Sequence, residues 1–77
     1  EKMISTGRID MVVELHGNVY VMELKLTKNG GIAAAERQIR DNRYAEPFKT
    51  PGHKVFALAV ELDDMGKGLI DWKQVET

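Results

Sequence analysis

Cysteine is absent from this 77-residue chain, and there are only two prolines and one tryptophan. Without cysteine the chain can form neither a disulfide framework nor a thiolate metal site, which suits a reducing cytoplasm. No apolar stretch approaches the roughly 20 residues of a membrane span, and no signal peptide is visible. We therefore expect a cytoplasmic protein that makes no contact with a membrane.

Excess charge of either sign is also missing. The formal net charge is −1 and the pI is about 6.1, which counts against an autonomous nucleic-acid binder because such domains are usually basic. A hydrophobic content of 43% beside 30% charged residues is typical of a folded domain and not of a disordered segment. A chain of this length forms one domain at most and buries only about 60% of its unfolded surface.

Two apolar runs predict β-strands. Residues 19–26 are rich in β-branched and aromatic residues, and residues 7–15 predict a second strand. Because side chains alternate along a strand, Glu23 and Lys25 share a face with Val21. A carboxylate and an ammonium are costly to bury on a mostly apolar strand without partners or a metal, so the pair indicates a functional site.

The segment between the two runs suggests how they pair. Gly17-Asn18 fits the two-residue loop of a β-hairpin, and in that register Val12 lies opposite Glu23 and Asp10 opposite Lys25. Asp10, Glu23 and Lys25 then lie on one face at the cross-strand and diagonal distances of a β-ladder. A slip of one residue would move Asp10 to the other face.

This cluster has the composition of a metal site. Carboxylates of Asp10 and Glu23 suit Mg²⁺ or Mn²⁺, and the backbone carbonyl of Leu24 could complete the protein's share of the coordination shell. Such an ion lowers the pKa of a bound water and neutralises charge on a phosphate under attack, while Lys25 would orient the water or stabilise developing charge. The alternative is an Asp10–Lys25 pair on a solvated face, with Glu23 merely exposed.

The same segments resemble the core of the PD-(D/E)xK nuclease superfamily. Gly7-Arg8-Ile9-Asp10 resembles the strand of the first acid, Glu23-Leu24-Lys25 the E-x-K strand, and Gln38 the auxiliary glutamine of the following helix. More narrowly, the chain is similar to the nuclease-like domain found after an AAA-ATPase-like domain in bacterial and archaeal proteins. The features typical of that group follow in order: Arg43-Tyr44-Ala45-Glu46-Pro47-Phe48, the apolar run 54–61 and Trp72.

This resemblance implies an α/β fold of the restriction-endonuclease type, an αβββαβ core with a mixed sheet and a crossover helix. Asp10 and Glu23 would bind the metal, and Lys25 and Gln38 would assist hydrolysis of a phosphodiester, with DNA as the substrate. The sequence before Asp10 is too short for the helix that opens such cores, so we expect residues 1–77 to be one nuclease-like domain of a longer protein with an N-terminal ATPase domain. The rival is a non-catalytic nuclease-fold module for dimerisation or nucleic-acid docking.

Residues 32–44 predict a helix, since most of them are good helix formers. The small Ala34 and Ala35 would let it lie close to the sheet. Gln38 falls in the stripe that should face the sheet, where it could reach a metal-bound water or a phosphate. The alternative is a buried amide bonded to the backbone or to Tyr44.

Charged residues elsewhere have ordinary interpretations. Arg37, Arg40 and Arg43 form either a solvated surface with pairs to neighbouring acids or the best basic patch of the chain. The acids Asp63-Asp64 lie in a loop and should face solvent.

Two further strands complete the expected sheet. The apolar run 54–61 predicts a strand covered on both faces and parallel to 19–26, because a helix separates the two, and residues 69–75 predict a short final strand. We expect a three-layer α/β domain, or most of one. The apolar face of residues 19–26 then needs a cover, for which a second copy of the chain is the simplest candidate: Tyr20, Met22, Leu24 and Leu26.

Overall fold

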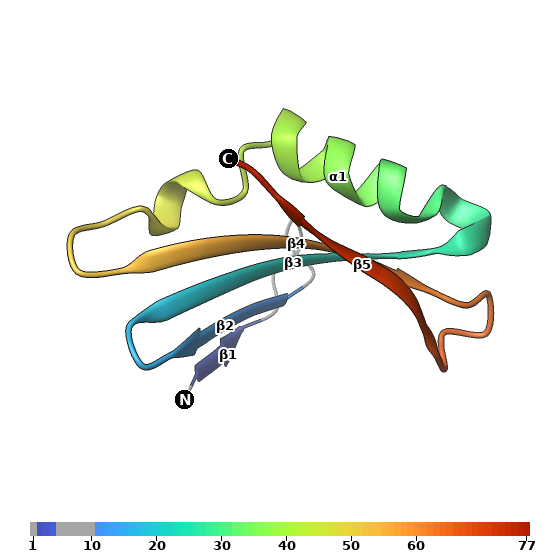
Figure 1. Cartoon of the computed structure of the whole chain (residues 1–77), viewed down its shortest axis with the longest axis horizontal. Coiled ribbons are helices and arrows are strands. Elements are labelled where there is room, and N and C mark those ends of the chain that lie inside the picture. The colour runs from blue at the N-terminus through green and yellow to red at the C-terminus, as the bar shows by residue number, and fades with distance from the viewer. Residues whose placement is uncertain (1, 5–10) are drawn as a thin grey trace.

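The computed structural model describes residues 2–4 and 11–77. Its strands are β1 (Lys2–Ile4), β2 (Met11–Leu15), β3 (Asn18–Leu26), β4 (Lys54–Leu62) and β5 (Leu69–Val75), and its helix is α1 (Gly31–Asp41). Short 3-10 turns, η1 (Thr27–Asn29) and η2 (Glu46–Phe48), precede and follow α1. The strands form one sheet in the order β1-β2-β3-β4-β5 (Figure 1).

The sheet is mixed, as expected for an α/β fold with a crossover helix. β3 and β4 pair in parallel along nine residues each, and α1 connects them. The other three pairings are antiparallel. The predicted parallel crossover is therefore confirmed, and the final strand has the bounds predicted from the sequence.

The β2–β3 hairpin differs from the prediction by its register. Its loop is His16-Gly17, with φ of 51° and 81°, so Leu15 pairs with Asn18 and Val12 lies opposite Val21 rather than Glu23. Asn18 is unavailable to the loop because it also pairs with Lys54 at the start of β4. The predicted and the observed register differ by two residues, so each described side chain of β2 and β3 keeps its predicted face.

The helix ends three residues earlier than predicted. Its last residue is Asp41, because Arg43 adopts a φ of 51°, a left-handed conformation that cannot continue an α-helix. The N–H of Tyr44 then bonds back to the carbonyl of Ile39 at 3.2 Å. This turn brings Tyr44 into the core beneath α1, where it can contact the helix it has just left.

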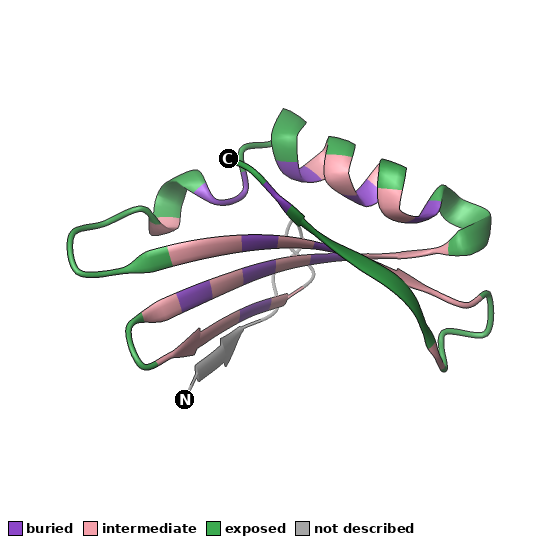
Figure 2. Ribbon diagram, viewed as in Figure 1, coloured by how far each residue is buried: buried purple, intermediate pink, exposed green. Residues whose placement is uncertain are grey.

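One face of the sheet, here called the covered face, packs against α1. Buried and half-buried residues alternate along β3 (Figure 2), and the buried set faces the helix. Ala35 of α1 and Ala57 and Ala59 of β4 are fully or almost fully buried, which lets helix and sheet approach closely. The prediction for the helix holds for Ala35, whereas Ala34 is only half-buried. The buried hydrophobic cluster consists of Val12, Val19, Val21, Ala35, Ile39, Tyr44, Ala57, Ala59 and Val75.

The opposite face, here called the open face, has no helix over it in the described part of the chain (Figure 1). The described residues therefore form two layers, which corresponds to most of a three-layer domain without its opening helix. Tyr20 and Phe56 stack there with ring centroids 5.3 Å apart, and Trp72, opposite Val60, is 58% exposed. The register assigns to this face Met11, Val13, Tyr20, Met22, Leu24, Leu26, Phe56, Leu58, Val60 and Trp72.

Across residues 11–77 and the short strand β1, no helix combines the length and the apolar character needed to cross a membrane.

Candidate functional site

Glu23 is the charged residue buried in the covered face. It follows Val19 and Val21 in the alternation of β3, and its side chain is only 2% exposed. Its partner in the parallel ladder is Ala59, a fully buried small residue. The alternative in which Glu23 is merely exposed is therefore wrong. Burying a carboxylate is costly unless charged or polar groups compensate.

Lys25 lies two residues further along the same face. Its Nζ is 3.7 Å from Oε2 of Glu23, and its side chain remains 27% exposed. This separation is too long for a strong hydrogen bond but close enough for electrostatic attraction in a partly desolvated position. The Lys25 ammonium therefore lies between the buried carboxylate of Glu23 and the protein surface.

Gln38 faces the same region from α1. Its Nε2 donates a hydrogen bond to the Tyr44 hydroxyl at 3.0 Å, and Nδ2 of Asn42 lies 3.4 Å from the same oxygen. The bond to Tyr44 that the alternative expected is therefore present, although Gln38 is half-buried and not fully buried. The bond occupies one of the two amide donors of Gln38 and holds its side chain in a fixed orientation.

An open groove of about 390 Å³ brings Lys25 and Gln38 together. The residues that line it are Lys25, Asn29, Ala34, Arg37, Gln38, Asp41 and Asn42. Donor groups dominate, with one carboxylate among them, so the groove suits an anionic ligand. The sequence analysis did not assign Asn29 or Asn42 to the site; for Asn42 the available signal was its i, i+4 spacing from Gln38.

Of the two remaining predicted site residues, Asp10 lies outside the described residues, so its convergence with Glu23 and Lys25 stays a prediction. Leu24 stands between Glu23 and Lys25 and pairs with Val60 in the β3–β4 ladder.

The donor chemistry fits a divalent cation only in part. Within residues 11–77 no three His, Cys, Asp or Glu side chains are grouped to hold a metal ion. The oxygen donors that the site does provide, the Glu23 carboxylate and the Leu24 carbonyl, are of the type that Mg²⁺ and Mn²⁺ prefer. These residues fit such an ion if a further carboxylate joins them.

The acids Asp63 and Asp64 are engaged by backbone groups of the loops. Oδ1 of Asp63 accepts the N–H groups of Met65 and Lys67 at 3.0 and 3.1 Å. Oδ1 of Asp64 accepts the N–H of Lys28 at 2.7 Å. Both carboxylates stabilise loop conformation, which argues against a separate metal site there.

Glu61 stabilises the segment between Lys25 and α1, a role that the sequence did not predict. Its Oε2 accepts the Thr27 hydroxyl at 2.6 Å, and its Oε1 accepts the N–H of Ile32 at 3.2 Å. Gly31 has a φ of 58°, and a Cβ there would lie 2.5 Å from Oε1 of Glu61. The carboxylate caps the N-terminus of α1, where it also interacts favourably with the helix dipole, and so fixes the chain just after Lys25.

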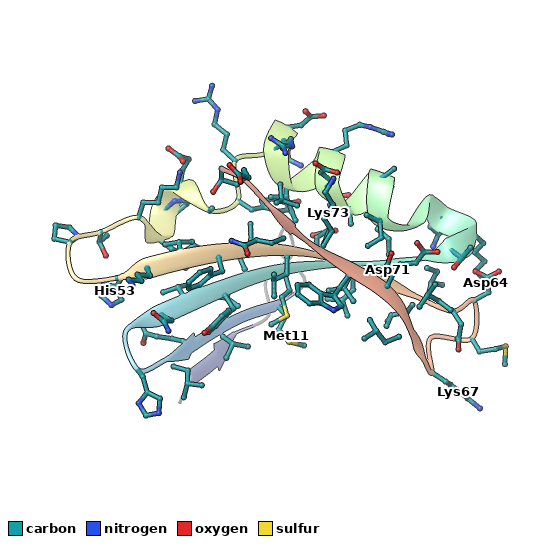
Figure 3. The ribbon with its side chains drawn as sticks, in the orientation of Figure 1. Met11, His53, Asp64, Lys67, Asp71 and Lys73 are labelled. Atoms are coloured by element: carbon teal, nitrogen blue, oxygen red, sulfur yellow. The ribbon has the colours of Figure 1, made fainter. Side chains whose placement is uncertain are left out.

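Charges on the outer side of α1 tie the helix to β5. Oε1 of Glu36 accepts a hydrogen bond from Nζ of Lys73 at 2.9 Å, and Oε2 accepts one from Nη2 of Arg40 at 3.0 Å. The bond from Lys73, followed by that from Arg40, holds the pKa of the Glu36 carboxyl below its usual value. Figure 3 shows Lys73 on the α1 side of the sheet and Met11 on the opposite side.

Comparison with known proteins gives a family and one relative. Residues 1–72 match the sequence profile of the PD-(D/E)XK nuclease superfamily. A protein of Azotobacter chroococcum mcd 1, described as "Uncharacterized protein in vnfD 5'region", is 31% identical over 70 residues. That match covers 91% of this chain but only 14% of the relative. No solved structure matches the chain significantly.

Proposed function

Because the chain belongs to the PD-(D/E)XK nuclease superfamily, we propose that it is a metal-dependent nuclease domain that hydrolyses phosphodiester bonds, with DNA as its substrate. One observation carries the proposal: a carboxylate that is 2% exposed lies 3.7 Å from a lysine lining a donor-rich groove. A purely structural role would not require this charge to be buried, since an apolar residue at the same position is usually as stabilising.

The proposal assigns the metal to Asp10, Glu23 and the carbonyl of Leu24. Support for Asp10 comes from the hairpin register, because Met11 pairs with Met22, which stands immediately before Glu23. Bound Mg²⁺ or Mn²⁺ would supply an activated water and neutralise charge on the attacked phosphate.

The other residues position the reactants. Lys25 is a compact donor on the accessible side of Glu23, suited to hold the attacking water or a phosphate oxygen as negative charge develops. Gln38 keeps one amide N–H and its carbonyl oxygen beyond its bond to Tyr44, and in the proposal these contact a water or a non-bridging oxygen. The bond to Tyr44 already orders the side chain of Gln38, so that side chain loses less conformational entropy when substrate binds.

Cleavage by the intact protein tests this proposal. Plasmid and linear duplex DNA are incubated with Mg²⁺ or Mn²⁺, and Lys25→Ala and Asp10→Ala are compared with Lys67→Ala, which removes a lysine from a distant loop. We expect cleavage by the wild type and by Lys67→Ala, and losses of about 10²–10³-fold in the two site variants, the scale of removing one transition-state donor. Equal activity in all four proteins would refute the assignment.

A second candidate function is favoured by the open face. A continuous apolar surface with Trp72 58% exposed is larger than a lone exposed side chain and marks an interaction site. In this candidate the domain is a non-catalytic module for dimerisation or nucleic-acid docking, joined to an ATPase. Metal-dependent cleavage that responds to Lys25 separates the two candidates.

The homodimer is compatible with both candidates. The apolar side chains of β2, β3 and β4 on the open face would meet their equivalents in a second copy across a twofold axis without like charges facing each other. An ATPase domain in the same protein is likewise part of the proposal, and its support is the resemblance of the segment from Arg43 to Phe48 to domains that follow such ATPases.

A further inference from the structure

The arginines of α1 and its following turn have different environments. Arg40 donates to Glu36 through Nε and Nη2 and to the Glu76 carbonyl through Nη1 at 3.1 Å. Arg43 lines a separate hollow that also contains Glu46 and Glu76. Neither arginine is therefore presented to an anion in the groove of Lys25.

Arg37 is the exception. It is exposed, it lines the groove with Lys25 and Gln38, and it makes no ion pair or side-chain hydrogen bond with any residue of the described segments. Asp41, one helical turn further on, borders the same groove but forms no ion pair with Arg37 within those segments. The guanidinium is thus available to a ligand.

The groove combines two cations with several neutral amides. Lys25, which adjoins the buried Glu23, and Arg37 of α1 both line it. Asn29, Gln38 and Asn42 contribute the amides. Two cations and several amide donors in one groove match a ligand that carries more than one anion together with neutral acceptors, as a sugar–phosphate backbone does.

We propose that Arg37 binds a backbone phosphate of the DNA strand next to the phosphodiester held at Glu23 and Lys25. This inference rests on the proposed function and specifies how the substrate is positioned there. A guanidinium binds phosphate oxygens in a bidentate manner, so one contact at Arg37 fixes the strand along the groove. Asp41 lowers the affinity for DNA by repelling the same phosphate. Neutralising Asp41 should therefore change the affinity in the direction opposite to the loss of Arg37.

Binding to a fluorescein-labelled duplex of about 20 base pairs tests the inference, measured by fluorescence anisotropy with the intact protein in EDTA over a series of salt concentrations. Arg37→Gln is compared with Arg43→Gln, a matched loss of one arginine charge outside the groove, and with Asp41→Asn. Because Arg37 has no partner in the described residues, its replacement should leave the melting temperature unchanged.

We expect Arg37→Gln to weaken binding about tenfold, the scale of one charged hydrogen-bonded contact, and to reduce the slope of log Kobs against log salt by about 0.9, one phosphate contact on duplex DNA. Arg43→Gln should bind as the wild type does, and Asp41→Asn more tightly. Equal losses in the two arginine variants, or a wild type that binds no DNA, overturn the inference. Arg37-dependent binding without any metal-dependent cleavage overturns the proposed function and leaves the phosphate contact standing.

Discussion

The two faces of the sheet each depart from simple burial rules at particular positions of β3. The covered face contains a carboxylate, Glu23, at 2% exposure, whereas the apolar Met22 and Leu24 beside it in sequence are only half-buried on the open face. Since apolar burial is the main favourable term in folding, an arrangement that buries a charge and leaves apolar side chains in water is not explained by the stability of this chain alone. The proposed metal site would account for the charge on the covered face, and the proposed second copy would account for the open face.

Replacement of Glu23 should give the largest effect, and it should fall on activity. Glu23→Gln keeps the shape and removes the charge, so we expect cleavage of DNA to fall about 10²–10³-fold while the melting temperature stays equal or rises, because the desolvation cost of the carboxylate is removed. Glu14→Gln on the neighbouring strand is the matched control and should keep its activity. A large drop in melting temperature with full activity would make Glu23 a structural residue.

Deletion of side-chain atoms on the two faces should differ in its effect on stability. Ile39→Ala empties a fully buried position in contact with the covered face and should cost about 2–5 kcal/mol. Leu24→Ala removes the same number of carbons from the open face and should cost about 1 kcal/mol or less, because its surface is already partly in water. Urea denaturation at low protein concentration measures both; similar losses would indicate that the open face is covered in solution.

Self-association should depend on the open face. If two copies pack there, sedimentation at micromolar concentration will give the mass of a dimer, and Trp72→Lys will shift it to a monomer by placing a charge in the contact. Lys73→Ala, on the α1 side of the same strand, should leave the mass unchanged. A cooperative wild-type monomer at these concentrations would contradict the homodimer.

The smallest effect concerns the salt bridges that hold α1 over the covered face. The Lys73 and Arg40 bonds lower the pKa of Glu36 from its ordinary 4.5, so the stabilisation they add is present above that value and is lost as the pH falls through the lower pKa of the folded state. Glu36→Gln should therefore melt slightly below the wild type at pH 7, and the difference should vanish in acid. A difference that grew below pH 4 would contradict this assignment.

Sequence predicted the faces of the sheet better than its register. Alternation along residues 19–26 placed Glu23 and Lys25 together correctly, because side-chain period is a local property. The hairpin loop was misplaced since Gly17 fits the loop on either reading, and the choice is made by Asn18 pairing with Lys54, a contact with a strand more than 30 residues away that no local pattern contains.

The candidate site was likewise only partly readable. Gln38 was correctly assigned to the helix facing the strand residues, but the end of that helix depends on the positive φ of Arg43, which an arginine rarely adopts. Glu61 could not be found as a cap because its partners Thr27 and Ile32 are 34 and 29 residues away. The one available hint was that Gly30-Gly31, which start the helix, carry no side chain able to cap it.

Trp72 is the one tryptophan in the sequence, and it lies opposite Val60 on the open face with more than half of its surface in water. The fluorescence of its indole therefore reports on the open face. The emission is red-shifted while the ring is hydrated and blue-shifted when another surface covers the ring and excludes water. Ligands entering the groove of Lys25, on the other side of the sheet, leave the indole in water. A single unlabelled spectrum can thus separate occupancy of one side of this small domain from occupancy of the other.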